Sequence, residues 1–484
     1  MMPMTSRQCK WPKTWLQAKL SLAKKQKTTD PFPLHKNKNK LPLMDDINLI
    51  AIEIGSSKIK GAIGSVDSHG ILTVKAVEEM PLSESVRYGQ LSNVAMAATT
   101  MRNIIQKIEN RMAATDKSRA PRKVEKVYVA VGGRSLFAVT HEVNRSLPAD
   151  SEVTPEIITA LTREAHGAGV PERDVLCVEP REFIIDNTRA DRPVGMYGSS
   201  IRMVANLIAC RPQMKNNLPR LFEDKLKLKV NTYVVRQLAI ADLVLSNDER
   251  KLGCMLVDFG AETTTVSVYK HGSLQYLATL PMGSRNITRD ITALNCVEED
   301  AENLKKNYGN AYPDSPSGTD DVKFTDLNNY ISHRAFEIIK NIQKQLEYAG
   351  FTHSELPAGI IIVGGGAKLN GFNRRLEETT KLPVRQGNAV AQGVRIAEGR
   401  IAPADSVDVI SILLHAAKND PQECLSEPEP LPTDLQPEPE PEPEKPAKQK
   451  SGFLKDVWKG FRRAIIDDIP TDPDGVDLGD DEDA

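Results

Sequence analysis

The chain has 484 residues, 63 basic and 65 acidic side chains and a formal net charge of −2. This length allows two or more domains with a substantial core, and the balanced charge excludes a general electrostatic affinity for nucleic acid. Six scattered cysteines without Cys-x-x-Cys spacing argue against a metal cluster or disulfide framework and favour a reducing cytosol, and no apolar run approaches the ~20 residues that span a bilayer.

Residues 1–44 are strongly basic, with ten Lys or Arg side chains against one acid, Asp30. They lack the apolar core of a signal peptide. The segment is either a disordered basic arm, or a stretch before a true start at Met44, or a membrane-surface helix. The last interpretation rests on four side chains near one helical face, Trp11, Trp15, Ala18 and Leu22. Pro12 and the lysine runs leave little ordered length, which favours the basic arm.

Residues 50–63 predict a β-hairpin with a tight turn, because an apolar strand runs into Gly55 and alternation resumes after two hydroxyl residues. Gly55 removes the side chain where the backbone turns, so the amides of Ser56 and Ser57 can point at one anion. Lys58 adds positive charge nearby. Glu53 stands where a carboxylate can hold hydrated Mg²⁺. A single hairpin of this kind is a weak indication of a phosphate site.

The next 180 residues alternate between helical and strand patterns. We expect a helix over 93–114, a buried strand over 124–131, and an insertion from 133 to about 204 that contains a helix over 156–168 started by Thr154 and Pro155. A strand over 203–209 is expected to return to the first half of the chain. Helical and strand patterns follow over 213–226 and 228–235, and a further helix over 238–245.

Residues 256–268 repeat the pattern of the first hairpin. An apolar strand leads to Asp258 and Gly260, and the hydroxyls of Thr263 and Thr264 follow. Two such hairpins about 200 residues apart predict two similar halves that face each other across a cleft. A third strand, 360–363, runs into Gly364, Gly365 and Gly366, whose backbone we expect to lie against the nucleoside. Between these elements, 276–282 reads as a strand and 283–348 as mostly helical, interrupted at 311–320.

The C-terminal region combines a linker with an amphipathic helix. We predict an extended linker over 401–450, because 427–446 contains eight prolines and six glutamates. A helix over 451–469 follows. Its amphipathic part is ~22 Å long, which is too short to span a membrane but suits a helix that lies on the membrane surface. Its apolar arc holds Phe453, Leu454, Val457, Trp458, Phe461 and Ile465, and its basic side chains are Lys455, Lys459, Arg462 and Arg463. An acidic tail over 470–484 ends the sequence.

In this order, the two hairpins and the glycine loop resemble the actin-like ATPase superfamily, and within it the FtsA family of bacterial cell-division proteins. Segments 127–133, 178–186, 193–196 and 290–309 also resemble FtsA, and 389–399 looks like the last connecting helix of the superfamily. The resemblance implies an α/β, actin-like (ribonuclease H-like) two-lobed fold with an inserted small α+β domain and a disordered C-terminal tail. It places the first lobe at 45–132 and 205–235, the insertion at 133–204, the second lobe at 236–282 and 351–400, and an upper subdomain at 283–350.

The resemblance also implies a function. The protein would bind ATP and Mg²⁺, form filaments, and tether FtsZ to the cytoplasmic face of the inner membrane at the division septum, where it recruits other divisome proteins. Glu53 and Asp258 would face the Mg²⁺, and Arg334 and Glu337 stand where the family often meets ribose and base. The second hairpin departs from the Asp-x-Gly-Gly-Gly-Thr pattern of the family at Ala261 and Glu262, which would place a Cβ and a negative charge near phosphate. Since neither hairpin offers a general base, we expect slow hydrolysis of ATP or none.

Three other classes of protein share this core. A pilus-assembly relative shares the core but is not expected to carry the tethered amphipathic helix. A sugar kinase would need an acidic base and a polar substrate pocket, and a chaperone of the heat-shock type would need a β-rich domain after residue 400. We find no signature of either in the sequence.

Overall fold

The structure is a computed structural model that describes residues 46–82, 85–115, 122–312, 322–391, 393–397 and 401–427. All of them belong to the first of the two compact units into which the chain divides, Met1–Glu429. The predicted basic arm, the amphipathic helix and the acidic tail lie outside the described residues. Within the described residues, no helix is both long and apolar enough to cross a membrane.

A six-stranded sheet carries the first hairpin. Its strand order is β11 (Lys229–Val235), β6 (Lys126–Val131), β1 (Ile47–Ile54), β2 (Lys58–Val66), β3 (Leu72–Pro81) and β17 (Val394–Ile396). β1, β2 and β3 form an antiparallel meander, whereas β6 and β11 add parallel strands on one side. A small hairpin, β4 (Val86–Arg87) with β5 (Gln90–Leu91), follows β3.

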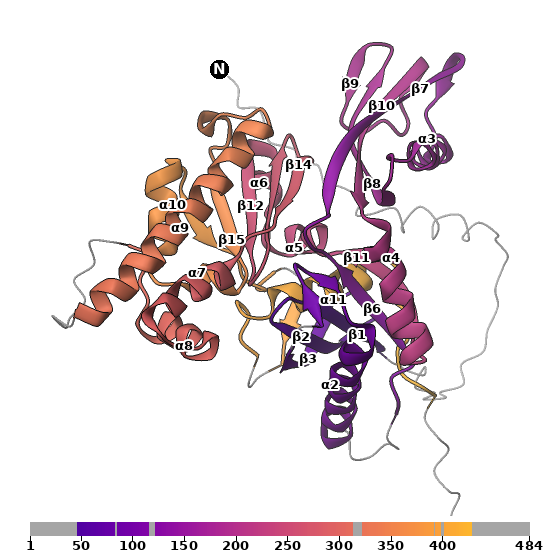
Figure 1. Cartoon of the computed structure of the whole chain (residues 1–484). Coiled ribbons are helices and arrows are strands. Elements are labelled where there is room, and N and C mark those ends of the chain that lie inside the picture. Colours follow the sequence, from indigo (N-terminus) through magenta and orange to yellow (C-terminus); the bar gives the residue numbers. More distant parts are fainter. Residues whose placement is uncertain are drawn as a thin grey trace, which may run out of the picture. The chain divides into compact units, whose positions relative to one another are not determined.

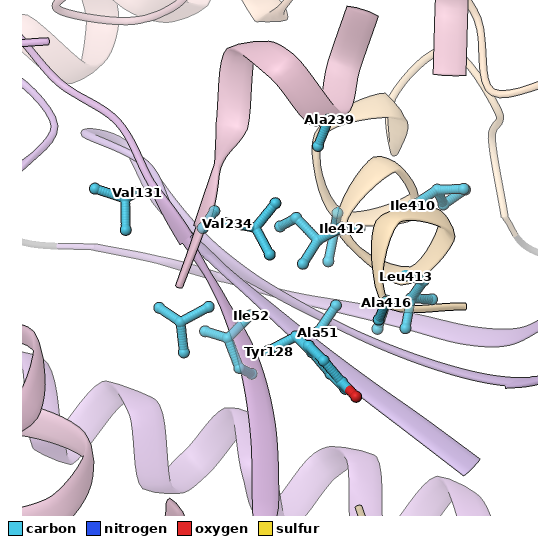
Figure 2. Close-up of a cluster of buried hydrophobic side chains, with 14 of the residues drawn as sticks. Ala51, Ile52, Tyr128, Val131, Val234, Ala239, Ile410, Ile412, Leu413 and Ala416 are labelled. Carbon is cyan, nitrogen blue, oxygen red and sulfur yellow. The ribbon is translucent and has the colours of Figure 1, made fainter. Parts of the chain in front are cut away.

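Two helices cover opposite faces of this sheet, α2 (Val94–Thr115) and α11 (Val407–Asn419) (Figure 1). Glycines of β2 allow both to come close. A Cβ at Gly61 would lie 2.6 Å from Ile108 of α2, and one at Gly64 would lie 3.3 Å from Leu413 of α11. The side chains between sheet and helices are apolar and almost fully buried. Figure 2 shows Ala51 and Tyr128 on the strands below Ile412, Leu413 and Ala416 of α11.

A nine-stranded sheet carries the second hairpin. Its order is β16 (Val384–Gln386), β15 (Ile360–Val363), β12 (Cys254–Phe259), β13 (Thr264–Lys270), β14 (Ser273–Leu280), β7 (Phe137–Glu152), β10 (Tyr197–Cys210), β8 (Asp174–Ile185) and β9 (Thr188–Ala190). A separate apolar core lies between its first strands and four helices, α7 (Ser284–Ile291), α8 (Glu298–Tyr308), α9 (Val322–Tyr348) and α10 (Phe372–Thr380). Short 3₁₀ turns occupy Thr292–Leu294, His353–Glu355 and Gly365–Lys368.

The inserted segment has its own core. Strands β7, β8, β9 and β10 form one half of the nine-stranded sheet and are covered by α3 (Pro155–Ala168), whose Leu161 and Ala165 are fully buried. A single pair, Ala278 with Phe137, joins this half to β14. Thr154 stands at the N-cap of α3 as predicted, but its side chain makes no capping hydrogen bond.

The strand expected over 203–209 does return to the first half of the chain, but without joining the sheet of that half. These residues belong to β10, which pairs with β7 and β8 along its whole length. Alternation explains its double role, because Met203, Ala205 and Leu207 enter the core of the insertion. Farther along the same strand, Ile208 and Cys210 enter the core of the first half. One strand therefore joins the two cores without changing sheets.

The connection between the two sheets is helical. α4 (Pro212–Pro219) continues into a π-helical turn, Arg220–Lys225, and leads to β11. β11 runs directly into α5 (Arg236–Val244), and α6 (Asn247–Leu252) follows before β12. Fully buried Gln237 of α5 donates to the Ser267 hydroxyl at 2.9 Å, so the start of α5 is fixed to the second hairpin.

Two predictions for the last part of the described chain are wrong. The described residues within 389–399 do not form a connecting helix, because Val394–Ile396 pairs with β3 and Gly393 takes a φ of +86°. The linker does not begin at residue 401, since Val407–Asn419 forms the buried helix α11. Beyond it, the Cys424 amide donates to the Asn48 carbonyl at 3.0 Å, and Leu425 bridges Val124. The chain is therefore held on the first sheet as far as Ser426.

Candidate functional site

The two predicted hairpins have the same turn. In the first, the Gly55 amide donates to the Lys58 carbonyl at 3.0 Å, and in the second the Gly260 amide donates to the Thr263 carbonyl at 2.9 Å. A Cβ at Gly55 would lie 2.9 Å from the Lys58 carbonyl oxygen, and a Cβ at Gly260 would lie 3.0 Å from the Thr263 carbonyl oxygen. Both turns therefore favour glycine for the same steric reason. The sequence correctly predicted two equivalent strand–turn–strand elements.

The hydroxyls at the turns differ in what they contact. The Ser56 hydroxyl accepts a hydrogen bond from the Gly89 amide at 2.8 Å, which ties the first turn to the β4–β5 hairpin. Ser57 is exposed. The Thr264 hydroxyl donates to the Met282 carbonyl at 2.9 Å, and the Thr263 side chain is buried beside it. Ser57 is thus the predicted hydroxyl that stands open to solvent.

Arg236 joins the carboxylates of the two hairpins. It is the first residue of α5, and its Nη1 donates to Glu53 Oε1 at 2.7 Å while its Nη2 lies 2.6 Å from Asp258 Oδ2. The second contact is an ion pair, and Asp258 Oδ2 accepts no hydrogen bond within the described residues. All three side chains are nearly buried, with 15% of Arg236, 3% of Glu53 and 7% of Asp258 exposed.

A second buried ion pair lies behind Glu53. Lys60 stands opposite Glu53 in the β1–β2 register, and its Nζ lies 2.6 Å from Asp408 Oδ2 at the start of α11. Lys60 also donates to the Asp405 carbonyl. Burial opposes the charge on this amine, but Asp408 and Glu53 raise the pKa of Lys60 above its ordinary value. The sheet and α11 therefore share a charged contact at the first hairpin.

The protonation of Glu53 is set by its burial. Loss of solvent and the nearby carboxylate of Asp408 raise the pKa of Glu53 from 4.5 to about 7, against the opposing effects of Arg236 and Lys60. For Arg236, burial disfavours the charge, but Asp258 and Glu53 outweigh it and raise the pKa of Arg236 above its ordinary value. Arg236 is therefore permanently charged, whereas Glu53 titrates near neutral pH.

Lys58 does not point its charge at the turn. Its Nζ lies 2.6 Å from Glu79 Oε2 on the neighbouring strand β3, and 39% of its side chain is exposed. Lys58 and Lys60 are two positions apart on β2, so both side chains lie on the same face of the sheet; Glu79 stands opposite Lys60 in the register, and Lys58 reaches it diagonally across β3. Lys58 is therefore paired with Glu79 rather than free beside the turn.

Both carboxylate oxygens of Glu262 have partners on other elements. Its Oε1 lies 2.8 Å from Arg285 Nη1, and its Oε2 accepts from the Tyr88 amide at 2.6 Å. The backbone of the second turn is occupied in the same way, because Ala261 accepts from the Arg285 amide at 2.7 Å. The departure at Ala261 and Glu262 thus ties the second turn to the start of α7 and to the β4–β5 hairpin.

The three glycines after β15 have different environments. Gly364 has a φ of +93°, and a Cβ there would lie 2.4 Å from the Phe259 carbonyl oxygen; one at Gly366 would lie 2.6 Å from the Phe259 ring. A Cβ at Gly365 would meet nothing within 4 Å among the described residues. Packing against the end of β12 therefore accounts for two of the glycines, and Gly365 is the one that leaves open space.

Arg334 and Glu337 lie together on α9. Arg334 Nε donates to Asp290 Oδ2 at 2.6 Å, and its Nη1 pairs with Glu337. These contacts link α9 to α7. They are sufficient to explain both side chains without a ligand.

The sequence did not single out Arg236, Lys60 or Asp408. Arg236 and Glu53 are separated by 183 positions, and Lys60 and Asp408 by 348. The alternating pattern 58–60 and the charge at the first helical residue after β11 are the only local signals, and both are common in strands and helices.

A groove of about 650 Å³ lies elsewhere, beside α3 of the insertion. Its walls are mainly apolar, and Arg163 and His166 are among its polar lining side chains. It lacks the repeated turns and clustered carboxylates described above. The candidate site for an anionic ligand is therefore the pair of hairpins around Arg236.

Comparison with protein families agrees with these features. A family model described as "Cell division protein FtsA" matches residues 255–404, and one described as "SHS2 domain inserted in FTSA" matches 133–209. The FtsA of Porphyromonas gingivalis is 30% identical over 351 residues, which cover 69% of this chain and 72% of that relative. The FtsA of Pseudomonas aeruginosa is 25% identical over 355 residues, covering 70% and 82%.

Among solved structures, a PilM–PilN type IV pilus biogenesis complex superimposes with a TM-score of 0.53 at 16% identity, covering 76% of this chain and 98% of that chain. At this identity the likeness concerns the fold alone. The predicted α/β, actin-like two-lobed fold with an inserted α+β domain is confirmed.

Proposed function

Because the chain belongs to the FtsA family of cell division proteins, we propose that it is a filament-forming, ATP-binding protein that tethers FtsZ to the membrane. It acts at the cytoplasmic face of the inner membrane, at the division septum, and recruits other divisome proteins there. The family membership supports the role in division, and the equivalent turns at Gly55 and Gly260 carry the proposal of ATP binding.

The polyphosphate is proposed to lie between the two turns. Amides after Gly55 and Gly260 face the anion, with Ser56, Ser57 and Thr263 beside it, and Gly365 leaves room for the adenosine. Mg²⁺ does not fit this arrangement in the way the sequence suggested. Glu53 Oε1 and Asp258 Oδ2 already contact Arg236, so these two oxygens are not offered to a metal.

Slow hydrolysis, or none, is part of the proposal. Four carboxylates lie around the turns, and each is engaged: Glu53 and Asp258 with Arg236, Glu262 with Arg285, and Asp408 with Lys60. A general base must be free to accept a proton from water. Rapid steady-state ATP turnover by the purified protein would contradict this part.

Membrane attachment is assigned to 451–469, which lies outside the described residues. One short amphipathic helix binds weakly, and a filament that presents many copies binds firmly through multivalency. The likeness to the pilus complex is one of fold, and we therefore do not add a pilus-assembly function.

The proposal is tested by incubating the full chain with ATP and anionic liposomes and viewing the mixture by electron microscopy. We expect filaments on the membrane that recruit FtsZ in co-sedimentation. Ser57→Glu places a negative charge on the exposed turn and should abolish ATP binding and filaments. Thr188→Glu, at an exposed position of β9, is the matched control. Filaments that form equally well with Ser57→Glu would overturn the assignment of the nucleotide site.

A further inference from the structure

The junction of β11 and α5 places a guanidinium between the two hairpins. Val235 ends β11 in extended backbone, and Arg236 begins α5 immediately afterwards. The side chain then runs past Gly132 at the end of β6, where a Cβ would lie 3.5 Å from Arg236 Nε. Strand, helix and glycine together direct Arg236 to the ends of β1 and β12, which carry Glu53 and Asp258.

A divalent cation at this site would be coordinated by oxygens of these two carboxylates. Mg²⁺ binds carboxylate oxygen at ~2.1 Å and keeps near-ideal octahedral geometry. Here Glu53 Oε1 and Asp258 Oδ2 each lie within 2.7 Å of a guanidinium nitrogen. A metal on either oxygen would stand close to a cation that cannot lose its proton. Mg²⁺ could reach these oxygens only after the buried pairs were broken.

Arg236 retains donors for a ligand. A guanidinium has five N–H groups; here one donates to Glu53 Oε1, and Asp258 is held by an ion pair at the other terminal nitrogen. Within the described part of the chain, Arg236 makes no further hydrogen bond, and 15% of its side chain reaches solvent. A planar, charged fork with free donors is well suited to phosphate oxygens.

We propose that Arg236 is the resident cation of the nucleotide site and takes the place of a carboxylate-bound Mg²⁺, so that this chain binds the polyphosphate of a nucleotide without needing the metal. This inference rests on the proposed ATP site. It differs from that proposal in its specific claim, which is that the site itself, and not the metal, neutralises the phosphates.

The test is ATP binding to the full chain by titration calorimetry, in MgCl₂ and separately in EDTA. We expect the wild type to bind with dissociation constants within about threefold of each other, since Arg236 supplies the charge in both. Arg236→Gln leaves Glu53 and Asp258 bare. It should lose at least about tenfold in affinity in EDTA and recover with Mg²⁺. Arg145→Gln, which removes an arginine paired with Glu164 in the insertion, should behave as the wild type.

Wild-type binding that weakens more than about tenfold in EDTA would overturn the inference while leaving the ATP site intact. That arm does not depend on the folding of a variant. If the wild type binds no ATP in either buffer, the proposed function fails. In that case, Mn²⁺ binding without nucleotide tests the role of Arg236. If the wild type binds Mn²⁺ and Asp258→Asn does not, Arg236 does not exclude a metal from the carboxylates.

Discussion

At the scale of single residues, Glu53 is the side chain whose charge changes near neutral pH. Its pKa is raised from 4.5 to about 7 in the folded protein. Between these values the folded state holds a proton that the unfolded state has released. The contribution of protonated Glu53 to the free energy of unfolding is therefore complete below pH 4.5. It is lost as pH rises through about 7, at up to ~1.4 kcal/mol per pH unit.

Urea unfolding of the wild type and of Glu53→Gln between pH 5 and 8 measures this effect. We expect the difference in free energy of unfolding between the two proteins to change across that range, because the amide does not titrate. Glu79→Gln, which removes the exposed carboxylate paired with Lys58, serves as the control for loss of a glutamate at this sheet. A difference that is constant from pH 5 to 8 would mean that Glu53 titrates elsewhere.

Alanine substitutions at Gly364 and Gly365 distinguish a glycine required for packing from one proposed to contact the ligand. Gly364→Ala forces a Cβ against the Phe259 carbonyl at a positive φ, so we expect a lower melting temperature or no folding. Gly365→Ala has open space around its Cβ and should leave the melting temperature within about a degree or two. If the adenosine lies on this loop, Gly365→Ala weakens ATP binding nonetheless. An unchanged affinity would move the adenosine away from Gly365.

Glu262 and Glu298 form a matched pair because both contact Arg285. Glu262 is 4% exposed and also accepts from the Tyr88 amide, whereas Glu298 is 51% exposed and lies 3.4 Å from Arg285. Removing the buried partner leaves a charge and an amide unsatisfied, which costs about 2–4 kcal/mol of stability. Glu298→Ala should cost below about 1 kcal/mol. Equal losses in thermal unfolding would contradict a connecting role for Glu262.

The sequence predicts those site residues whose role depends on neighbours in the chain, and not those whose role depends on contacts with distant segments. Gly55 and Gly260 were found because their requirement arises within four consecutive residues. Arg236 was missed because its partner Glu53 is 183 positions away, and no local pattern marks the first residue of a helix as an ion-pair partner. The role of Glu262 was misjudged for the same reason, since Tyr88 and Arg285 come from other elements.

At the scale of elements, α11 shows how a helix can be hidden by its neighbours in the sequence. Val407–Asn419 has apolar residues at helical spacing after Ser406, and eight of its thirteen residues are buried. The proline-rich stretch that follows led us to extend the linker back over it. The opposite holds at 389–399, where the resemblance to the actin-like superfamily implied a helix. There, Gly393 forms a turn and Val394–Ile396 completes the edge of a sheet.

The burial of α11 predicts that it is required for the first lobe. Leu413 is fully buried against β2, so Leu413→Ala should lower the free energy of unfolding by about 2–5 kcal/mol. Lys418→Ala, on the exposed side of the same helix, should change it by less than about 0.5 kcal/mol. Chemical unfolding of both variants is the measurement. A small effect of Leu413→Ala would favour the linker that the sequence suggested.

At the scale of the whole molecule, α11 runs between the charged cluster and the exit of the C-terminal segment. Its first turn places Asp408 on Lys60 beside Glu53. After its last turn, Glu423 accepts from the Asn48 amide at 2.9 Å, near the start of β1, which carries Glu53 next to its other end. The proposed nucleotide site and the point where the chain continues to the linker therefore lie at opposite ends of β1.

This arrangement allows the membrane tether and the nucleotide site to work independently. The 23 residues 428–450 would extend over about 70 Å as a proline-rich linker. Trp458→Glu puts a charge into the apolar arc of the predicted helix, and we expect it to release the protein from anionic liposomes in co-sedimentation. Its affinity for ATP should stay that of the wild type.

Trp11→Glu is the matched control, because Trp11 belongs to the alternative membrane helix in the basic arm. If that arm is the anchor, Trp11→Glu releases the protein and Trp458→Glu does not. Release by both variants would mean that two weak helices act together, which the multivalency of a filament would amplify. Retention of both variants on liposomes would exclude either helix as the tether, and with it the surface on which the filament is proposed to assemble.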